Sequence, residues 1–199
     1  MRSRAAPDGA GRCVRCALRL PACGCPLLVP LPIHTHFLVL RHVREAQKSS
    51  NTARWAALLL PRCELQPWSG RQDAARFADL GRPGDWLLFP SEAGKSDGAA
   101  PGGAPERVLV LDGTWRQAHR MLRALPALQH LPRLSVPPRP LGFRLRAPPS
   151  PVHLSTLEAM ASAVALLEGE AQANAVDNCH RALVGRALSA RGRRLPEAA

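Results

Sequence analysis

Short apolar runs alternate along the chain with segments in which apolar residues recur every three or four positions. The apolar runs span residues 35–41, 63–68, 85–89, 108–111 and 131–136. Their length and the turn residues that bound them are typical of strands buried in a sheet. Helical spacing covers residues 52–60, 72–80, 115–125, 154–164 and 174–190. The alternation predicts an α/β domain, with a mostly parallel sheet flanked by helices.

The segment from Arg107 to Ala124 shows this pattern most clearly. An apolar run at 108–111 breaks at Asp112-Gly113, and a helical pattern then buries one face. Thr114 and Gln117 have the spacing of a capping box at the helix start. In open α/β sheets, ligands lie at the carboxyl ends of strands, against the N–H groups of such helix starts. Asp112 therefore places a carboxylate where we expect a ligand.

A second capping box, Ser155 with Glu158, opens the helix near residue 155. Its core face consists of Leu157, Met160, Ala161 and Val164. The sequence contains no GxGxxG or Walker pattern, and no Ser-His-Asp nucleophile arrangement can be assigned.

Four cysteines lie within thirteen residues near the start of the chain. Cys13 and Cys16 form a CxxC pair, and Cys23 and Cys25 form a CxC pair in which Gly24 allows the turn. Two close pairs suit a tetrahedral zinc ion bound by four thiolates. The alternatives are a redox CxxC or buried cysteines without a ligand, and the second pair so close by favours zinc.

The formal net charge is +12, from 27 lysines and arginines against 15 acidic residues. This balance indicates a polyanionic partner, nucleic acid first and an acidic membrane second. An arginine-rich composition that merely reflects a high-GC genome is the alternative. No apolar run approaches the ~20 residues of a membrane span, and the first residues lack a signal-peptide core. We expect a cytoplasmic protein with no membrane partner and no evident obligate protein partner, whose cysteines are thiols or metal ligands.

We expect three parts in the chain. Residues 1–30 form a zinc knuckle with a flexible leader, residues 31–190 form the main domain, and residues 191–199 form a basic tail. The 199 residues, 46% of them hydrophobic, are enough for one domain with a substantial core.

Five sequence elements resemble the DTW-domain family, the tRNA-uridine aminocarboxypropyltransferases, whose signature is D-x-T-W. The elements are the four cysteines, His42 with Lys48-Ser-Ser-Asn-Thr-Ala53, Leu88-Phe-Pro-Ser-Glu92, Leu111-Asp-Gly-Thr-Trp115 and Leu154-Ser-Thr-Leu-Glu-Ala159. Each is weak alone, but five in this order are specific, and they run through most of the chain. The family is similar to the SPOUT class, in which a C-terminal trefoil knot binds S-adenosylmethionine. The resemblance therefore implies a SPOUT-like fold with such a knot.

The resemblance also implies an activity. Such an enzyme transfers the 3-amino-3-carboxypropyl group of S-adenosylmethionine to N3 of a tRNA uridine and releases methylthioadenosine. Asp112 would be the catalytic base, since N3 is a weak nucleophile while protonated. Trp115 would stack on adenine or on the target base, with a place in the core as the alternative. Glu92, Asp112 or Glu158 would hold the ammonium group of the cofactor, and the two capped helix starts its carboxylate.

The implied site residues fall into two sets. The cofactor-binding set is Pro90, Ser91, Glu92, Asp112, Gly113, Thr114, Trp115, Ser155, Thr156 and Glu158. The tRNA-binding set is Lys48, Arg54, Arg116, Arg120, Arg123, Arg144 and Arg146. Two other readings stay open: an RNA methyltransferase that uses the same cofactor, and a zinc-containing RNA-binding protein without catalysis.

Overall fold

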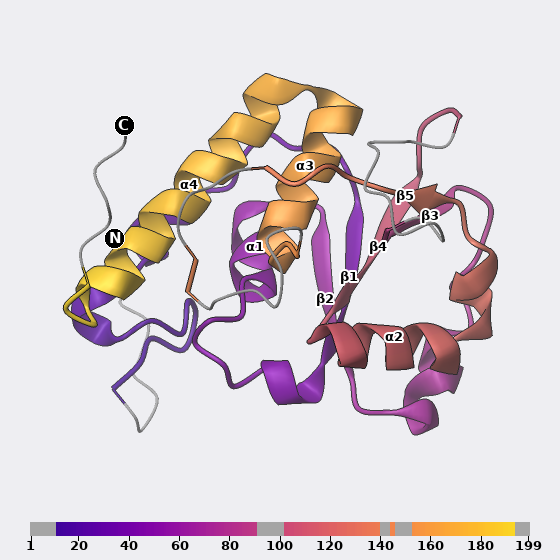
Figure 1. Ribbon diagram of the computed structural model, residues 1–199, viewed down its shortest axis with the longest axis horizontal. Helices are drawn as coiled ribbons and strands as arrows, with labels where there is room; N and C mark the ends of the chain where they lie inside the picture. The colour runs from indigo at the N-terminus through magenta and orange to yellow at the C-terminus, as the bar shows by residue number, and fades with distance from the viewer. Residues whose placement is uncertain (1–10, 91–101, 140–143, 146–152, 194–199) are drawn as a thin grey trace.

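Five parallel strands form one twisted sheet in the computed structural model (Figure 1). The structure describes residues 11–90, 102–139, 144–145 and 153–193. The strands are β1 (Phe37–His42), β2 (Cys63–Trp68), β3 (Asp85–Leu88), β4 (Arg107–Asp112) and β5 (Arg133–Leu134). Their order across the sheet is β2-β1-β4-β3-β5, and each neighbouring pair is parallel. The prediction of an α/β domain with a parallel sheet is confirmed.

Helices connect the strands and cover both faces of the sheet. The α-helices are α1 (Ala53–Leu59), α2 (Trp115–Ala124), α3 (Thr156–Glu168) and α4 (Glu170–Ser189). Short 3₁₀ helices are η1 (Leu20–Ala22), η2 (Cys25–Leu27), η3 (Val43–Glu45), η4 (Arg71–Phe77) and η5 (Pro126–His130). No helix in the described ranges is long and apolar enough to cross a membrane. Both predicted capping boxes are present, at the starts of α2 and α3.

Three elements differ from the sequence prediction. The run predicted as a helix over 72–80 is the 3₁₀ helix η4, in which only Phe77 is buried, so little packing supports a regular α-helix. Strand β5 is shorter than the predicted 131–136, and Pro132, directly before it, has no N–H for the ladder. Helix α4 starts before the predicted residue 174, directly after Gly169, whose φ of 104° separates it from α3.

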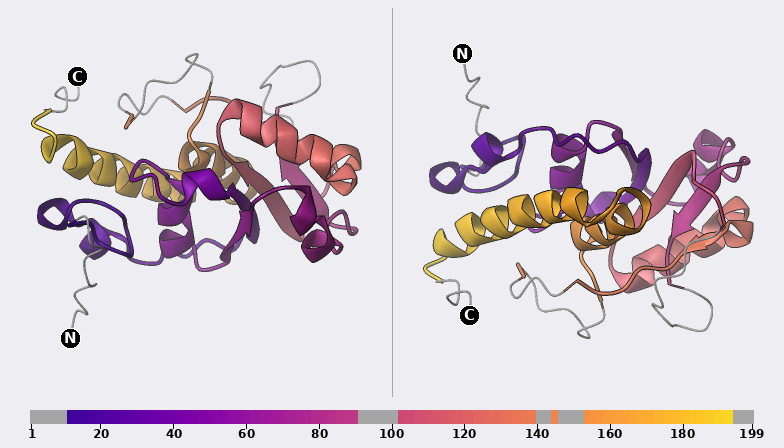
Figure 2. Two further views of the ribbon diagram at one scale, coloured as in Figure 1. Left: turned by 90° about the horizontal axis from the view of Figure 1, so that it is seen from below. Right: turned by 90° about the horizontal axis from the view of Figure 1, so that it is seen from above.

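Alternate residues of the strands point to opposite faces, so the sheet separates two cores. On β1, Phe37 and Val39 face a core shared with α1, α3 and α4, whereas Leu38 and Leu40 face a core shared with α2, η4 and η5. Figure 2 shows helices on both sides of the sheet from two directions. Because Asp112 follows Val108 and Val110 at two-residue steps, its side chain lies on the α1 and α3 side.

The cysteine-rich segment packs against α1 and α4. Trp55 on α1 donates its Nε1–H to the carbonyl of Cys16, at 2.9 Å, and Arg186 on α4 donates to the carbonyl of Cys23, at 2.8 Å. Gly24 lies so close to α4 that a Cβ there would be 2.3 Å from a methyl carbon of Leu183. The segment thus shares the main core. The division at residues 30 and 190 stays a prediction, as does the trefoil knot, which depends on a path through residues 140–143 and 146–152, outside the described ranges.

Candidate active site

Asp112 ends strand β4 and is 3% exposed. Its register partner on β1 is Arg41, so the two residues lie side by side on one face of the sheet. Asp112 Oδ1 accepts a hydrogen bond from the Thr156 hydroxyl at 2.5 Å, and Oδ2 accepts one from the Asn51 side-chain amide at 2.6 Å. Both partners are neutral donors. Two hydrogen bonds from neutral groups therefore hold the carboxylate in one orientation, and neither of them is part of an ion pair.

Burial raises the pKa of the Asp112 carboxyl above its ordinary value, because the charged form is poorly solvated there. The hydrogen bonds from Thr156 and Asn51 work in the opposite direction, as does the charge of Arg41, while Glu45 adds to the rise. A carboxylate with a raised pKa is a stronger base than an exposed aspartate. Asp112 therefore has the electrostatic character of a general base.

Segments far apart in the sequence meet around Asp112, because the carboxyl ends of parallel strands lie at one edge of the sheet. Asn51 and Thr52 precede α1, and Ser155 and Thr156 open α3. The hydroxyl of Thr52 accepts a hydrogen bond from the N–H of Leu157 at 3.2 Å, which ties the two segments together. Four of the five sequence elements that suggested the family thus contribute to one site.

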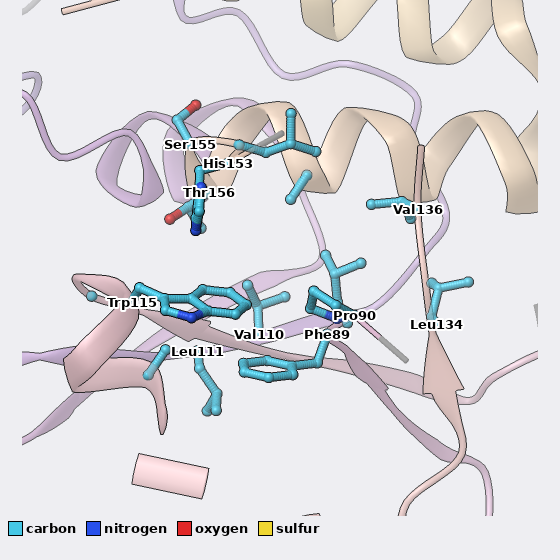
Figure 3. Close-up of a pocket in the computed structure, with 15 residues that line it drawn as sticks. Phe89, Pro90, Val110, Leu111, Trp115, Leu134, Val136, His153, Ser155 and Thr156 are labelled. Carbon is cyan, nitrogen blue, oxygen red and sulfur yellow. The ribbon is translucent and has the colours of Figure 1, made fainter. Parts of the chain in front are cut away.

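An apolar cavity of about 320 Å³ lies between the strand ends and α3 (Figure 3). Trp115 forms one side, stacked on Phe89 with ring centroids 5.2 Å apart and planes 10° apart. His153 meets Trp115 edge-on at 5.3 Å. The rest of the lining is mostly aliphatic, including Val110 and Leu134. Trp115 is 44% exposed, so the alternative that placed it in the core is wrong. Such a cavity suits a flat, largely apolar ring.

A polar cavity of about 320 Å³ adjoins the first. Its lining includes the polar side chains of Glu45, Asn51, Asp112, Arg144 and His180. The two cavities share residues 113, 115 and 153–156 in their linings. His180 is buried, its Nδ1 has no hydrogen-bond partner among the described residues, and burial lowers its pKa. The buried Asp112 carboxylate lines the polar cavity, and the residue after it, Gly113, lines both cavities.

Glu158 is fully buried and already has partners for both oxygens. Oε1 accepts from Arg144 Nε at 2.8 Å, and Oε2 accepts from the N–H of Ser155 at 2.6 Å as part of the capping box. In α3, the N–H groups of Leu157 and Glu158 are bonded to hydroxyls. In α2, the Thr114 hydroxyl accepts from Gln117 N–H. The first turns of the two helices therefore offer fewer N–H groups to a ligand than their sequence suggested.

The four N-terminal cysteines lie together, with their sulfur atoms within 4.8 Å of one another. The two closest contacts are Cys13 with Cys25 at 3.5 Å and Cys16 with Cys23 at 3.8 Å. For Cys13, burial acts to raise the pKa, but hydrogen bonds from backbone and from thiols outweigh it and lower the pKa to about 7. In the described part of the chain, no other group of three or more His, Cys, Asp or Glu side chains is compact enough to hold a metal ion. The donor set and its compactness fit one zinc ion.

The basic residues proposed for tRNA lie in two kinds of surroundings. Arg116, Arg120 and Arg123 are exposed on α2, opposite its buried face. The other three described ones make contacts within the protein: Lys48 pairs with Glu45, Arg54 donates to the carbonyls of Val14 and Ala46, and Arg144 donates to Glu158 and to the carbonyl of His153. Ser91, Glu92 and Arg146 lie outside the described residues.

Sequence reasoning did not assign five residues that the structure places at the site: Arg41, Asn51, Phe89, His153 and His180. Asn51 and Phe89 lie inside sequence elements that match the family, so the sequence pointed to these segments but not to the roles of the two residues. His180 lies in the middle of α4, in an otherwise ordinary helical pattern. Only the tertiary structure brings it to the cavity.

The fold and site define an α/β protein with a ligand site at the carboxyl edge of a parallel sheet, joined to a compact four-cysteine cluster. The chain belongs to the DTW-domain family, whose DTW domain matches residues 10–188. It is 28% identical over 172 residues to a Drosophila melanogaster protein named tRNA-uridine aminocarboxypropyltransferase 2, and the match covers 81% of this chain and 68% of the fly protein.

A Macaca fascicularis protein of the same name is 27% identical over 167 residues. That match covers 78% of this chain and 56% of the macaque protein, so the chain spans little more than half of that relative. No solved structure matches the chain. The family assignment suggested by the sequence elements is confirmed.

Proposed function

We propose that this protein is a tRNA-uridine aminocarboxypropyltransferase. It moves the 3-amino-3-carboxypropyl group of S-adenosylmethionine to N3 of a uridine in tRNA, with methylthioadenosine as the second product. The observation that carries the reaction class is the similarity, over about four fifths of the chain, to two proteins of that name. The site supports it with a buried carboxylate in the lining of a polar cavity that adjoins an apolar one.

The two cavities fit the two ends of S-adenosylmethionine. Phe89 and Trp115 form a stacked aromatic wall for the adenine ring, and an aromatic face also attracts a sulfonium cation. The polar cavity, with Asn51 and Asp112 in its lining, suits the amino acid end. When bound, the cofactor supplies a sulfonium that makes the neighbouring side-chain carbon open to displacement. The protein's residues orient the groups and move a proton.

Asp112 is the proposed base. A carboxylate oxygen has two lone pairs, and the hydrogen bonds from Thr156 and Asn51 use one on each oxygen. The second lone pairs are available to an N3–H group that enters the polar cavity. Asp112 accepts the N3 proton and leaves an anionic nitrogen, which is the better nucleophile. The raised pKa of the carboxyl strengthens this step.

Other finer assignments belong to the same proposal. Zinc bound by Cys13, Cys16, Cys23 and Cys25 stabilises the N-terminal knuckle. The SPOUT-like fold with a C-terminal trefoil knot is part of the same proposal. The arginines on α2 contact tRNA phosphates beside the site.

Product identification tests the reaction directly. The protein is incubated with unmodified tRNA and S-adenosylmethionine, and the small product is identified by mass spectrometry. Methylthioadenosine, with a matching mass gain on one uridine, is expected. S-adenosylhomocysteine would select the methyltransferase reading, because attack would then fall on the methyl carbon. If no tRNA is turned over, the remaining reading is an RNA-binding protein without catalytic activity.

The α2 surface has its own test. Replacing Arg116 and Arg120 with alanine removes two exposed cations, so tRNA affinity should fall and its salt dependence should become flatter. Replacing Arg71 and Arg76 on η4 removes the same charge elsewhere and serves as the control. An unchanged slope in the α2 variant would place the RNA on another surface.

A further inference from the structure

A small cleft lies where the cysteine-rich segment meets the C-terminal end of α4. Its volume is about 90 Å³, much smaller than the cavities at Asp112. Arg12 and Arg19 line it from the cysteine-rich segment, Arg191 from the end of α4, and Ser49 from the loop before α1. The views in Figures 1 and 2 place the indigo N-terminal segment beside the yellow end of α4.

The chemistry of this cleft is that of an oxyanion site. Three of its lining residues are arginines, and none is acidic. Within the described part of the chain, neither Arg19 nor Arg191 takes part in a salt bridge. A guanidinium group matches the geometry of a phosphate with two parallel N–H donors. A serine hydroxyl adds an O–H donor. The cleft has room for a phosphate group.

The cleft and the polar cavity are joined by consecutive residues. Ser49 lines the cleft, whereas Ser50 and Asn51 line the polar cavity. Consecutive Cα atoms are about 3.8 Å apart, so the linings of the cleft and of the polar cavity meet in the loop before α1. A strand whose base enters the polar cavity would therefore carry a backbone phosphate toward the cleft.

We propose that this cleft binds a backbone phosphate of the tRNA close to the target uridine, through Arg19, Arg191 and Ser49. The inference rests on the proposed function, since it names how the RNA reaches that same site. It gives the cysteine-rich segment a task beyond stability. The four-cysteine segment holds Arg19 against the end of α4, where Arg19 and Arg191 together would fix the strand near Asp112.

A structural role is the competing explanation for these arginines. The carboxyl end of a helix carries partial negative charge, and cations near it stabilise the fold. In that case, removing Arg19 and Arg191 would lower the melting temperature without changing the tRNA affinity of the folded protein. The two explanations therefore predict different observables.

Fluorescence anisotropy with a labelled tRNA transcript, over a range of salt concentrations and without cofactor, tests the proposal. The variant carries Arg19→Ala and Arg191→Ala. Its matched control carries Arg15→Ala and Arg181→Ala, which are exposed residues of the same two elements outside the cleft. We expect roughly tenfold weaker binding for the cleft variant, as for a lost charge-assisted hydrogen bond, and a log–log salt slope flatter by about one. The control should change much less.

Three results would overturn the proposal. These are wild-type affinity in the cleft variant, an equal loss in both variants, and a lower melting temperature with unchanged affinity. Inorganic phosphate that binds in the cleft while tRNA affinity stays unchanged would make it a small-anion site instead. If the alanine variant does not fold, a variant with Arg19→Lys and Arg191→Lys replaces it. Lysine keeps the charge but loses the two parallel N–H donors, so several-fold weaker tRNA binding is expected. Wild-type affinity in the lysine variant would overturn the assignment.

Because only binding is measured, the assay separates the cleft from the reaction. A protein that binds tRNA through the cleft but yields no methylthioadenosine would overturn the proposed function alone. If the cleft variant forms methylthioadenosine with the same KM for tRNA as wild type, the proposed phosphate site is overturned and the proposed function is not.

Discussion

Replacing Asp112 with asparagine separates the chemistry of the site from its architecture. Asparagine keeps the size of the side chain and can keep both hydrogen bonds. Its carbonyl oxygen takes the place of Oδ2 as acceptor for Asn51, and its amide donates to the Thr156 hydroxyl, which can rotate to accept. The fold should therefore be retained, whereas the base and its negative charge are lost.

The expected effect on rate is large, and the expected effect on stability is small. A general base contributes about 10²- to 10⁴-fold, so transfer should fall by that factor. Because both hydrogen bonds persist, the free energy of unfolding should change by no more than about 1 kcal/mol. Cofactor affinity should also fall if the carboxylate contacts the ammonium group.

The stability difference should depend on pH. Burial raises the pKa of the Asp112 carboxyl in the folded protein above its unfolded value. The folded state therefore binds more protons than the unfolded chain between those two pKa values, and wild-type stability falls as the pH rises through this window. The asparagine variant lacks this loss. Relative to wild type, it should be more stable at pH 8 than at pH 4.

Methylthioadenosine formation measured by mass spectrometry gives the rate, and thermal unfolding at the two pH values gives the stability. Asp79→Asn is a suitable control, because it removes a carboxylate whose side chain is 61% exposed and lies away from the cavities. Turnover within tenfold of wild type in Asp112→Asn would refute the assignment of the base. Equal destabilisation at both pH values would refute the account of its burial.

Three further predictions address the neighbours of this carboxylate and the metal. Thr156→Val removes a hydrogen bond that lowers the pKa of Asp112, so the acidic limb of the pH–rate profile should move to higher pH; an unmoved limb would exclude Asp112 as the titrating group. Purified protein should hold about one zinc per chain by elemental analysis, with loss in Cys16→Ser but not in Cys63→Ser; metal-free wild type would contradict this. Trp115→Ala should weaken S-adenosylmethionine binding roughly tenfold, as measured by calorimetry. The melting temperature of this variant should stay close to that of wild type, because Trp115 is 44% exposed. Unchanged affinity would remove Trp115 from the cofactor site.

The main elements of the fold could be predicted because local signals and burial agree there. The apolar run at 108–111 is buried from both faces of the sheet, and the capping-box residues Thr114 and Ser155 each open a helix. The prediction was less accurate where tertiary packing decides. The run at 72–80 has helical spacing, but only Phe77 within η4 is buried, so a tighter and shorter helix forms.

The candidate site was predictable only in part, because its residues come together from distant positions. Asp112 was accessible to sequence reasoning, since it directly follows a buried strand and precedes a capped helix. Asn51 was not, because its contact with Asp112 joins residues 61 positions apart. His180 was hidden in the periodic pattern of α4, and only the packing of that helix beside α3 brings it to the polar cavity.

The partners of the carboxylates at this site support the proposal of Asp112 as the base. Three of them are buried at or beside the polar cavity. Glu45 pairs with Lys48 and Glu158 pairs with Arg144, so each of these carboxylates already has a cation in direct contact. Asp112 receives only a hydroxyl and an amide, although Arg41 is its register partner across the sheet. Burial therefore raises the pKa of Asp112, and we propose this carboxylate, rather than its cation-paired neighbours, as the base.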